Sequence, residues 1–549
     1  MTPVDKGLLP TSKFNPVRRP APTSPLPGRH SVYTLRLPGP RAWLHRCAWA
    51  SLSAVVAMPA YGHGFGMRYD LPLPLHLWIV GAAATVLLSF LIVAIAIRTH
   101  SADGAPALTN VRGRPPRNGG AEGKTTFVAR VIAVAALILI VAAGIAGDQT
   151  PTRNLAPTAI WIAWWVGFSY LSAFVGNVWS VVNPWSAVFD WYERFWSKRS
   201  ARRRATVAWP ERLGVWPATA LFLVFAWLEL IWEGRSIPSH LAWLAVGFSI
   251  LTWTGMFLFG RRAWLAHGDP FALAFGVLSR FGLAQSRVEP AVCDTCAASG
   301  RVLAADRADA LKCDDCYRAS ERGRRWSLQP PGAGLLNTET ITPSLVVFVI
   351  VMLSTVTFDG LMATPFWQRI ENTLYAALPA LGGARLAVIN TLGLVSFCVV
   401  FVAVYHVIAA LIARAAKNRV TPDAASRAFV LTLVPIAIAY LIAHYLSYFL
   451  IQGQLLIRLA SDPFGFGWNI FGTAGFRPDI GIVGARFVWY TSLFAIVIGH
   501  VAAVSLAHII ALRRLGDARL AIRSQIPMLV LMVAYTMLSL WIIAQPIVE

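Results

Sequence analysis

Long apolar runs alternate with short polar segments along most of the chain. Ten of these runs are long enough for a helix that crosses a bilayer, which needs about 20 apolar residues. They are centred near residues 87, 137, 168, 224, 249, 352, 398, 439, 498 and 535. The pattern predicts an all-α fold, a polytopic bundle of about ten transmembrane helices.

The composition agrees with a membrane protein and argues against a nucleic-acid-binding one. Of the 549 residues, 56% are hydrophobic and only 13% are charged, with a mean hydropathy of +0.57. Soluble domains are less apolar than this. The net charge of +22 comes from Lys and Arg in short loops between apolar runs, which form no continuous basic face. We therefore expect the lipid bilayer as a partner and no nucleic acid.

The first 62 residues predict no packed structure. Residues 1 to about 40 are rich in Pro, Arg and Ser, a composition typical of disorder. A basic flank then precedes a short apolar run that ends in small residues, which resembles a secretory signal cleaved before His63. An uncleaved short first helix is the alternative. If the signal is cleaved, the free amine and imidazole of His63 become a metal-binding pair.

Charge in the loops predicts the orientation of the bundle. Most loop Lys and Arg lie in the segments 98–126, 185–214, 260–342, 412–427 and 512–524. The positive-inside rule places these loops in the cytoplasm and the mature N-terminus outside the bacterial inner membrane. The chain then divides into an N-terminal region (1–62), a first half-bundle (63–260), a cytoplasmic loop (261–342) and a second half-bundle (343–549).

Two stretches on the expected cytoplasmic side resemble each other. "VGFSYLS" precedes "NPWSAVFDWYERF" (183–195), and "VGFSILT" precedes "DPFALAFGVLSRF" (269–281). Each predicts a short helix that begins at an Asn-Pro or Asp-Pro step. In the first, an aromatic stripe faces the membrane while Asp190, Glu193 and Arg194 should turn toward water. A weak parallel repeat and two independent interfacial anchors both fit this pattern.

Four of the six cysteines form two C-x2-C pairs separated by sixteen residues: Cys293, Cys296, Cys313 and Cys316. Two such pairs complete a tetrahedral zinc site with no open position, so the zinc would be structural and the loop a small zinc ribbon. An iron centre and a redox dithiol are the alternatives. The other two, Cys47 and Cys398, lie in apolar runs and should be small buried side chains.

Ionisable side chains lie inside the predicted spanning helices: Glu229, Asp359, His406, His444, His500 and His508. Polar groups at membrane depth are costly, so each is a candidate functional residue. Tyr440, His444, Tyr448 and Gln452 also follow one another at i, i+4 and share one helix face. Neutral histidines that hydrogen-bond across the bundle are the alternative interpretation.

Several polar stretches should meet on the outer side. "YGHGFGMRYDLPLPL" contributes His63 and Arg68, "TFDGL" contributes Asp359, and "SDPFGFGWNIFG" contributes Asp462. A convergent outer site built from His63, Asp70, Asp359, His444 and Asp462 is therefore geometrically allowed.

Six motifs in this order resemble the bacterial multi-pass membrane proteins called fenitrothion hydrolase. They are "HGFGMRYDLPLPL", "TRNLAPTAIWIAWWVGFSYLSAFVGNVWSVVNPW", "TFDGL", "PIAIAYLIAHYLSYFLIQGQ", "SDPFGFGWNIFG" and "FVWYTSLFAIVIGHVAAVSLAH", spread from about residue 61 to 515. The resemblance implies a membrane-bound organophosphorus hydrolase that cleaves an aryl phosphorothioate triester to a nitrophenol and a dialkyl thiophosphate. The tetracysteine loop is not part of this pattern.

Such a substrate sets clear chemical demands. A neutral triester with a good leaving group needs a hydroxide and a polarised P=S or P=O bond, both of which a divalent metal supplies. Histidines and carboxylates are suitable ligands. We expect His444, Asp359 and Asp462 as bases or ligands and Arg68 as an anion-stabilising group. A second divalent metal at the outer site would be held by His63 and His500.

A function of another class is equally open at this stage. Ten helices with histidines at several depths also suit a transporter of copper or of small molecules, or an assembly factor that handles metal. A second membrane subunit is a further expected partner, for the hydrolase as well as for this alternative.

Overall fold

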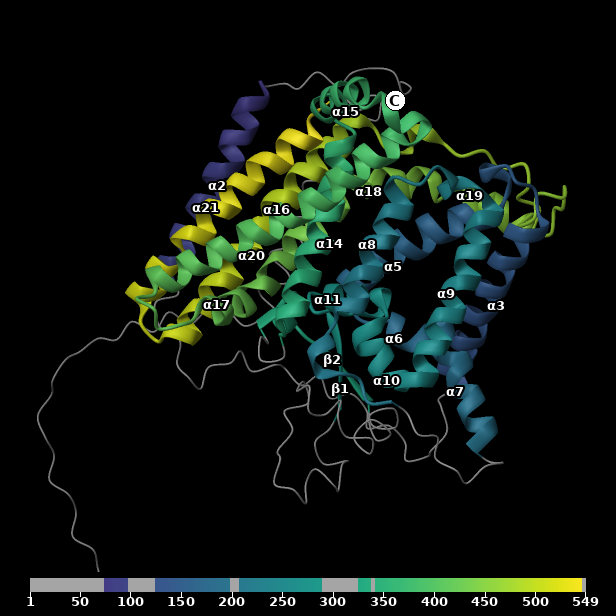
Figure 1. The fold of residues 1–549 in the computed structure, drawn as a ribbon, viewed down its shortest axis with the longest axis horizontal. Coiled ribbons are helices and arrows are strands. Elements are labelled where there is room, and N and C mark those ends of the chain that lie inside the picture. Colours follow the sequence, from purple (N-terminus) through teal and green to yellow (C-terminus); the bar gives the residue numbers. More distant parts are fainter. Residues whose placement is uncertain (1–73, 97–123, 198–206, 289–323, 337–340, 546–549) are drawn as a thin grey trace, which may run out of the picture. The chain divides into compact units, whose positions relative to one another are not determined.

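The computed structural model describes residues 74–96, 124–197, 207–288, 324–336 and 341–545, and within them the chain is almost entirely helical (Figure 1). The strands in this part of the chain are β1 (Ala284–Val288) and β2 (Arg324–Leu328), an antiparallel pair with Ala284 opposite Leu328. The predicted signal, His63, Arg68, Asp70 and the four clustered cysteines lie outside the described residues. The zinc site and the N-terminal predictions therefore stay predictions.

Nine helical segments of the described chain are long and apolar enough to cross a membrane. This confirms a membrane-embedded multi-pass protein. The segments are Leu75–Ala96 (α2), Lys124–Ala146 (α3), Glu211–Leu230 (ending in α8, Trp216–Leu230), Pro238–Phe259 (α9), Pro343–Met362 (α14), Pro379–Ala415 (ending in α16, Arg385–Ala415), Pro422–Ser461 (containing α17, Pro422–Phe429, α18, Val434–Gln452, and α19, Leu455–Ser461), Ala485–Leu515 (α20) and Ala518–Ile543 (α21).

The tenth apolar run, centred near residue 168, takes a less regular form. It begins with one turn of α4 (Leu155–Pro157), widens into the π-helix η2 (Thr158–Val166) and continues as α5 (Gly167–Phe174). Trp165 and Val166 of the π-helical part are buried. Long π-helical stretches are rare and are often found at functional sites. This run is not among the nine regular segments.

Shorter helices connect and cover the long ones. The short helices are α6 (Trp179–Val182), α7 (Pro184–Ser197), α10 (Arg261–Ala263), η5 (Trp264–Gly268), α11 (Pro270–Ser279) and α15 (Pro365–Ala377). Single 3-10 turns are η1 (Pro151–Arg153), η3 (Glu211–Leu213), η4 (Glu233–Ser236), η8 (Ala333–Leu336), η9 (Pro379–Ala384), η10 (Val430–Leu433) and η11 (Ile480–Ile482).

The two similar stretches do form short helices, α7 and α11, as the sequence predicts. Each begins at its proline, and the residue before that proline caps it. The side-chain oxygen of Asn183 accepts a hydrogen bond from Ser186 N at 3.0 Å, and Asp269 Oδ1 accepts one from Phe271 N at 2.9 Å. Proline at the first position and Asn or Asp at the N-cap both favour a helix start, which explains the shared local geometry.

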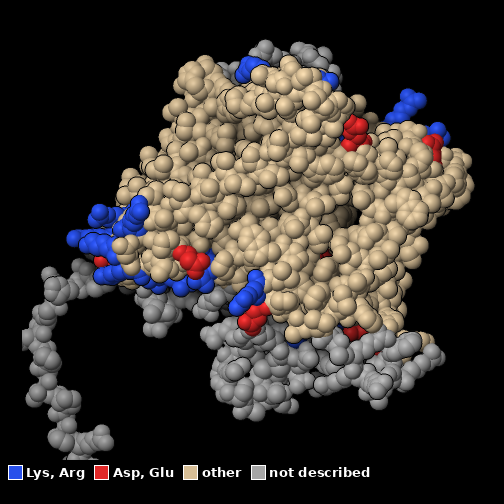
Figure 2. Space-filling view, viewed as in Figure 1, with Lys and Arg blue, Asp and Glu red and all other residues tan. Residues whose placement is uncertain are grey.

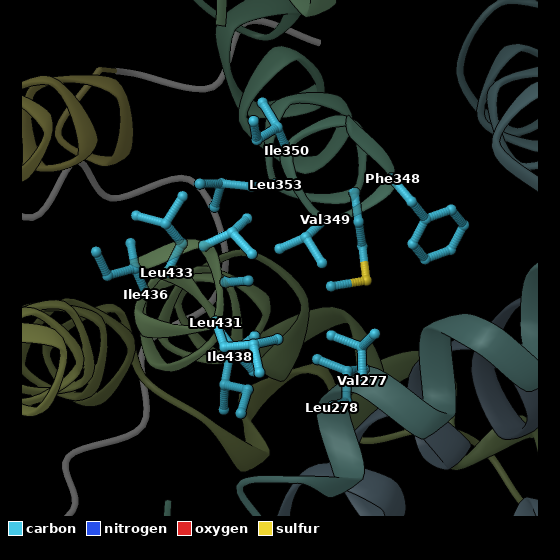
Figure 3. Packing of buried hydrophobic residues seen from close by; sticks show 14 of the residues in the cluster. Val277, Leu278, Phe348, Val349, Ile350, Leu353, Leu431, Leu433, Ile436 and Ile438 are labelled. Atoms are coloured by element: carbon cyan, nitrogen blue, oxygen red, sulfur yellow. The ribbon is translucent and has the colours of Figure 1, made fainter. Parts of the chain in front are cut away.

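Two segments form the centre of the bundle. In Pro343–Met362 and Pro422–Ser461, 83% of the most apolar window is buried, against 17% in α3. Side chains of α14 interdigitate with those of η10, α18 and α11, among them Val349, Leu353 and Leu278 (Figure 3). Cys398 is buried beside α14, where Ser354 Oγ donates to its Sγ at 3.2 Å, which confirms the prediction for this cysteine.

Charged side chains are concentrated at one end of the bundle. Most of the face in Figure 2 carries no charge, while Lys and Arg gather around α17 and the junction of α20 with α21. Arg513 and Arg514 end α20, and Arg519 and Arg523 lie in the first turns of α21. We call this the basic end. The C-terminal ends of α8, α14 and α18 lie at the opposite end (Figure 1).

Candidate functional site

A hydrogen-bonded acid lies between the two central helices. His444 Nε2 of α18 is 2.8 Å from Asp359 Oδ2 of α14, and the Tyr445 hydroxyl donates to the same oxygen at 2.7 Å. These residues are 85 and 86 positions apart in the chain and meet because α14 packs against α18. With Nε2 donating to the carboxylate, the neutral imidazole keeps the lone pair of Nδ1 as an acceptor.

The side chains of His444 and Asp359 are mostly buried but keep some exposed surface. The side chains of His444 and Asp359 are 25% and 23% exposed, whereas Tyr445 is buried. Along the same helix face Tyr440 is buried and Tyr448 is 45% exposed. The predicted polar stripe of α18 thus leads from the core to the surface and passes the pair on its way.

Further polar residues surround the pair. Glu229, near the end of α8, lies close enough to Asp359 for their charges to interact and within hydrogen-bonding reach of Trp165. Arg235 lies near both carboxylates. Its Nη1 donates to the backbone oxygens of Leu230 and, at 3.3 Å, Glu229, so the guanidinium is held at the C-terminal end of α8. We call the following group the Asp359 site: Trp165, Glu229, Arg235, Asp359, His444 and Tyr445.

Asp462, predicted to join this site, is engaged in its own loop. Its Oδ1 accepts from Phe466 N at 3.0 Å and its Oδ2 from Gly467 N at 2.7 Å. The loop continues against another segment, since Asp148 N donates to the Phe464 oxygen at 2.8 Å. Asp148 Oδ1 accepts a hydrogen bond from Thr150 N at 2.8 Å, and its hydrogen bonds with Thr150 lower the pKa of the Asp148 carboxyl. In the described structure no hydrogen bond or ion pair joins Asp462 to Asp359 or His444.

The other histidines lie apart from the pair. His500 is buried in α20, its Nδ1 lies 2.8 Å from the Ile496 oxygen, and its ring centre is 5.8 Å from that of Tyr535. His406 has the same backbone contact but sits on an exposed face of α16, and His508 is 3.0 Å from Gln525 Nε2. Over the described ranges, no group of three or more His, Cys, Asp or Glu side chains is arranged to hold a metal ion.

A second cluster of charged side chains joins α3, α7 and α10. It shows that the prediction for Asp190 is wrong. Asp190 of α7 does not face water: its side chain is only 7% exposed and contacts three arginines. The distances are 3.1 Å to Arg130, 2.7 Å to Arg194 and 3.7 Å to Arg261. The helical pattern of α7 places Asp190 on the polar face of that helix. This face is covered by α3, which carries Arg130, and by α10, which carries Arg261. We call this cluster the Asp190 network.

Three members of the Asp359 site were not selected by the sequence pattern. Tyr445 follows His444 and therefore lies about 100° away on the helix, outside the i, i+4 stripe. Arg235 follows an apolar run and looks like an ordinary loop cation. Trp165 is one of several tryptophans in its run. For Tyr445, the one signal present in the sequence is a second polar aromatic residue directly after a membrane histidine.

Comparisons with protein-family models, with curated proteins and with solved structures found no match.

Proposed function

We propose that the protein is a membrane-embedded hydrolase of neutral aryl phosphotriesters or phosphorothioate triesters, with His444 as the general base. The observation that carries the proposal is the His444–Asp359 hydrogen bond of 2.8 Å in a pair that is still partly exposed. The resemblance to fenitrothion hydrolases supplies the substrate class.

The pair can carry the proton transfer that such a hydrolysis needs. Nδ1 of His444 takes a proton from a water molecule while the water oxygen attacks phosphorus and the bond to the aryloxide oxygen breaks. The aryloxide leaves, and the remaining proton of the attacking water is lost from the acidic thiophosphate product. The imidazolium that forms is stabilised by the Asp359 carboxylate, which Tyr445 keeps in place by its own hydrogen bond.

The charges around the pair favour a neutral substrate. The Asp359 carboxylate lies beside His444 and would repel an anionic phosphate ester, while a neutral triester meets no such repulsion. Arg235 interacts electrostatically with both Glu229 and Asp359, and it is suited to stabilise the anionic product. An apolar triester also partitions into the bilayer, from which the helix ends can be reached.

The proposal routes no step through a metal. A typical catalytic metal site has three protein ligands, and in the described residues no group of three or more His, Cys, Asp or Glu side chains is arranged to hold a metal ion. A divalent metal would need His63 or another side chain outside the described ranges. The structural zinc on Cys293, Cys296, Cys313 and Cys316 is a separate part of the proposal, and metal analysis of purified wild type and Cys293→Ser protein tests it.

Nitrophenolate release by membranes from expressing cells tests the function. His444→Ala and Asp359→Asn should each lower the rate about a hundredfold or more, since general base catalysis contributes roughly 10² to 10⁴. His406→Ala is the control, because this histidine lies on an exposed face of another long apolar helix, where its Nδ1 is 2.8 Å from the Val402 oxygen, and the variant should keep the wild-type rate.

The same assay separates the alternatives. Membranes that never release nitrophenolate, in vesicles that accumulate copper, would support a transporter instead. Activity that requires a co-expressed second membrane protein would keep the reaction but make this chain one subunit of the enzyme. For orientation, we propose that the basic end faces the cytoplasm and the Asp359 site the outside of the inner membrane, following the positive-inside rule.

A further inference from the structure

A second group of buried polar side chains lies next to the Asp359 site, deeper in the bundle. Thr357 of α14 is hydrogen-bonded to the hydroxyl of Tyr535 of α21. The His500 ring lies 5.8 Å from the Tyr535 ring, and Tyr440 of α18 stacks on His444 at 6.3 Å between ring centres. Thr357, Tyr440, His500 and Tyr535 are all buried.

Two buried polar atoms near Tyr535 have no direct hydrogen-bond partner in the described structure: Tyr440 Oη and His500 Nε2. Tyr440 interacts electrostatically with Tyr535, and Ser539 lies within hydrogen-bonding reach of the Tyr535 hydroxyl. Buried polar atoms are nearly always paired with protein or with ordered water. Tyr405, equally buried in α16, shows the usual outcome, since its hydroxyl donates to the Ser426 oxygen at 2.7 Å.

Gly360 connects this group to the Asp359 site. A Cβ at this position would lie 2.6 Å from the Tyr440 hydroxyl, so only a glycine lets that hydroxyl approach the backbone of α14. Asp359 is the preceding residue, and its charge interacts with Tyr440. Tyr440 thus interacts electrostatically with both Asp359 and Tyr535, and the Tyr535 ring lies 5.8 Å from the His500 ring.

We propose that ordered water lies beside Tyr535 and bonds to Tyr440 Oη and His500 Nε2. Buried water takes two to four polar partners, and these side chains supply that number. The water completes a hydrogen-bonded path from the Asp359 site to the middle of the bundle, along which protons can move. This inference does not depend on the hydrolysis reaction, because it concerns other side chains and a different ligand.

Radiolytic hydroxyl-radical footprinting of the purified full-length protein tests the water directly. Radicals formed from bound water label neighbouring side chains even when bulk solvent is excluded. Tyr440 and Tyr535 should be labelled several-fold faster than Tyr405, which is buried without an unpaired atom. Labelling of Tyr440 and Tyr535 no faster than that of Tyr405 would mean that the region is dry, and the proposal would be wrong.

Tyr440→Phe provides a second measurement, with Tyr405→Phe as its matched control. Removing the Tyr440 hydroxyl takes away one partner of the water, so labelling of Tyr535 should fall at least twofold. Tyr405→Phe should leave Tyr535 labelling unchanged. Unchanged labelling of the exposed Tyr448 verifies that both variants are folded, and equal Tyr535 labelling in wild type and Tyr440→Phe would contradict the proposal.

Discussion

Asp190 and Asp359 are both carboxylates in the interior of one helical bundle, yet their surroundings differ in kind. Asp190 contacts three arginines and is almost completely buried. Asp359 contacts one histidine and one tyrosine, and its side chain remains about a quarter exposed.

The difference shows what a buried acid can do in each place. In the Asp190 network every neighbour is a permanent cation, so the carboxylate has no reason to exchange a proton and serves to join α3, α7 and α10. At the Asp359 site the partner is a histidine, which gains and loses a proton near neutral pH and keeps its second ring nitrogen available. The first arrangement favours stability, and the second favours chemistry.

The largest effect is expected at the Asp190 network. Asp190→Asn leaves the buried guanidinium groups of Arg130 and Arg261 facing a neutral amide, which should lower the free energy of unfolding by about 3–5 kcal/mol. Thermal unfolding in detergent measures it. Arg194→Gln is the control, since this arginine is half exposed and its ion pair should contribute about 1 kcal/mol or less. If the Asp190→Asn variant were as stable as wild type but did not hydrolyse the triester, Asp190 would be needed for the reaction and not for stability, contrary to this interpretation.

Asp269 is a third buried acid, and no ion pair joins it to a cation in the described part of the chain. Burial raises its pKa from 3.8 to about 6, against the effect of its hydrogen bonds to Ala272 N and Phe271 N. The folded protein then binds the proton more tightly than the unfolded one, so stability should fall as pH rises from about 4 to about 6, by about 3 kcal/mol at most.

Asp269→Asn tests this, because asparagine keeps the helix cap and carries no charge. Unfolding temperatures across pH 4 to 7 should show the drop in wild type and a smaller one in the variant. Parallel curves for the two proteins would rule out Asp269 as the cause.

A smaller effect is expected from Tyr445. Tyr445→Phe removes a hydrogen bond to the Asp359 carboxylate, worth about 1.5 kcal/mol, so nitrophenolate release should fall about tenfold. Tyr448→Phe, an exposed tyrosine on the same helix, should have the wild-type rate. If both variants were unchanged, Tyr445 would not be needed to hold the carboxylate.

The smallest effect on activity is expected from Asp462. Both of its oxygens accept backbone hydrogen bonds within one loop, so Asp462→Asn should cost about 1 kcal/mol of stability and change nitrophenolate release less than twofold. A loss as large as that of His444→Ala would instead place Asp462 in the reaction.

Much of the fold could be predicted from the sequence because helices in a bilayer satisfy their own backbone and need only an apolar run. The short helices α7 and α11 could be predicted from local sequence, since Asn183 and Asp269 each cap the helix that follows. The run near residue 168 shows the limit, because an apolar stretch contains no signal that separates π-helical from α-helical turns.

For the Asp359 site, the sequence identified single candidate residues but not the contacts between them. Asp359 and His444 each attract attention as ionisable groups at membrane depth, whereas their contact depends on how α14 packs on α18, which periodicity does not encode. The prediction that Asp190 faces water was wrong because it considered only the helix that carries this residue. Its own helix gave it a polar face, and only the placement of Arg130 and Arg261 on other elements explains why that face is buried.

The bonds from His444 and Tyr445 to one oxygen also fix how α14 and α18 can move. Neighbouring residues point about 100° apart around a helix axis, so they hold the carboxylate from two sides. Turning α18 in either direction breaks one bond, and sliding it along α14 strains both. The two bonds therefore resist rotation of α18 against α14, and this contact should move less than helix contacts that lack such bonds.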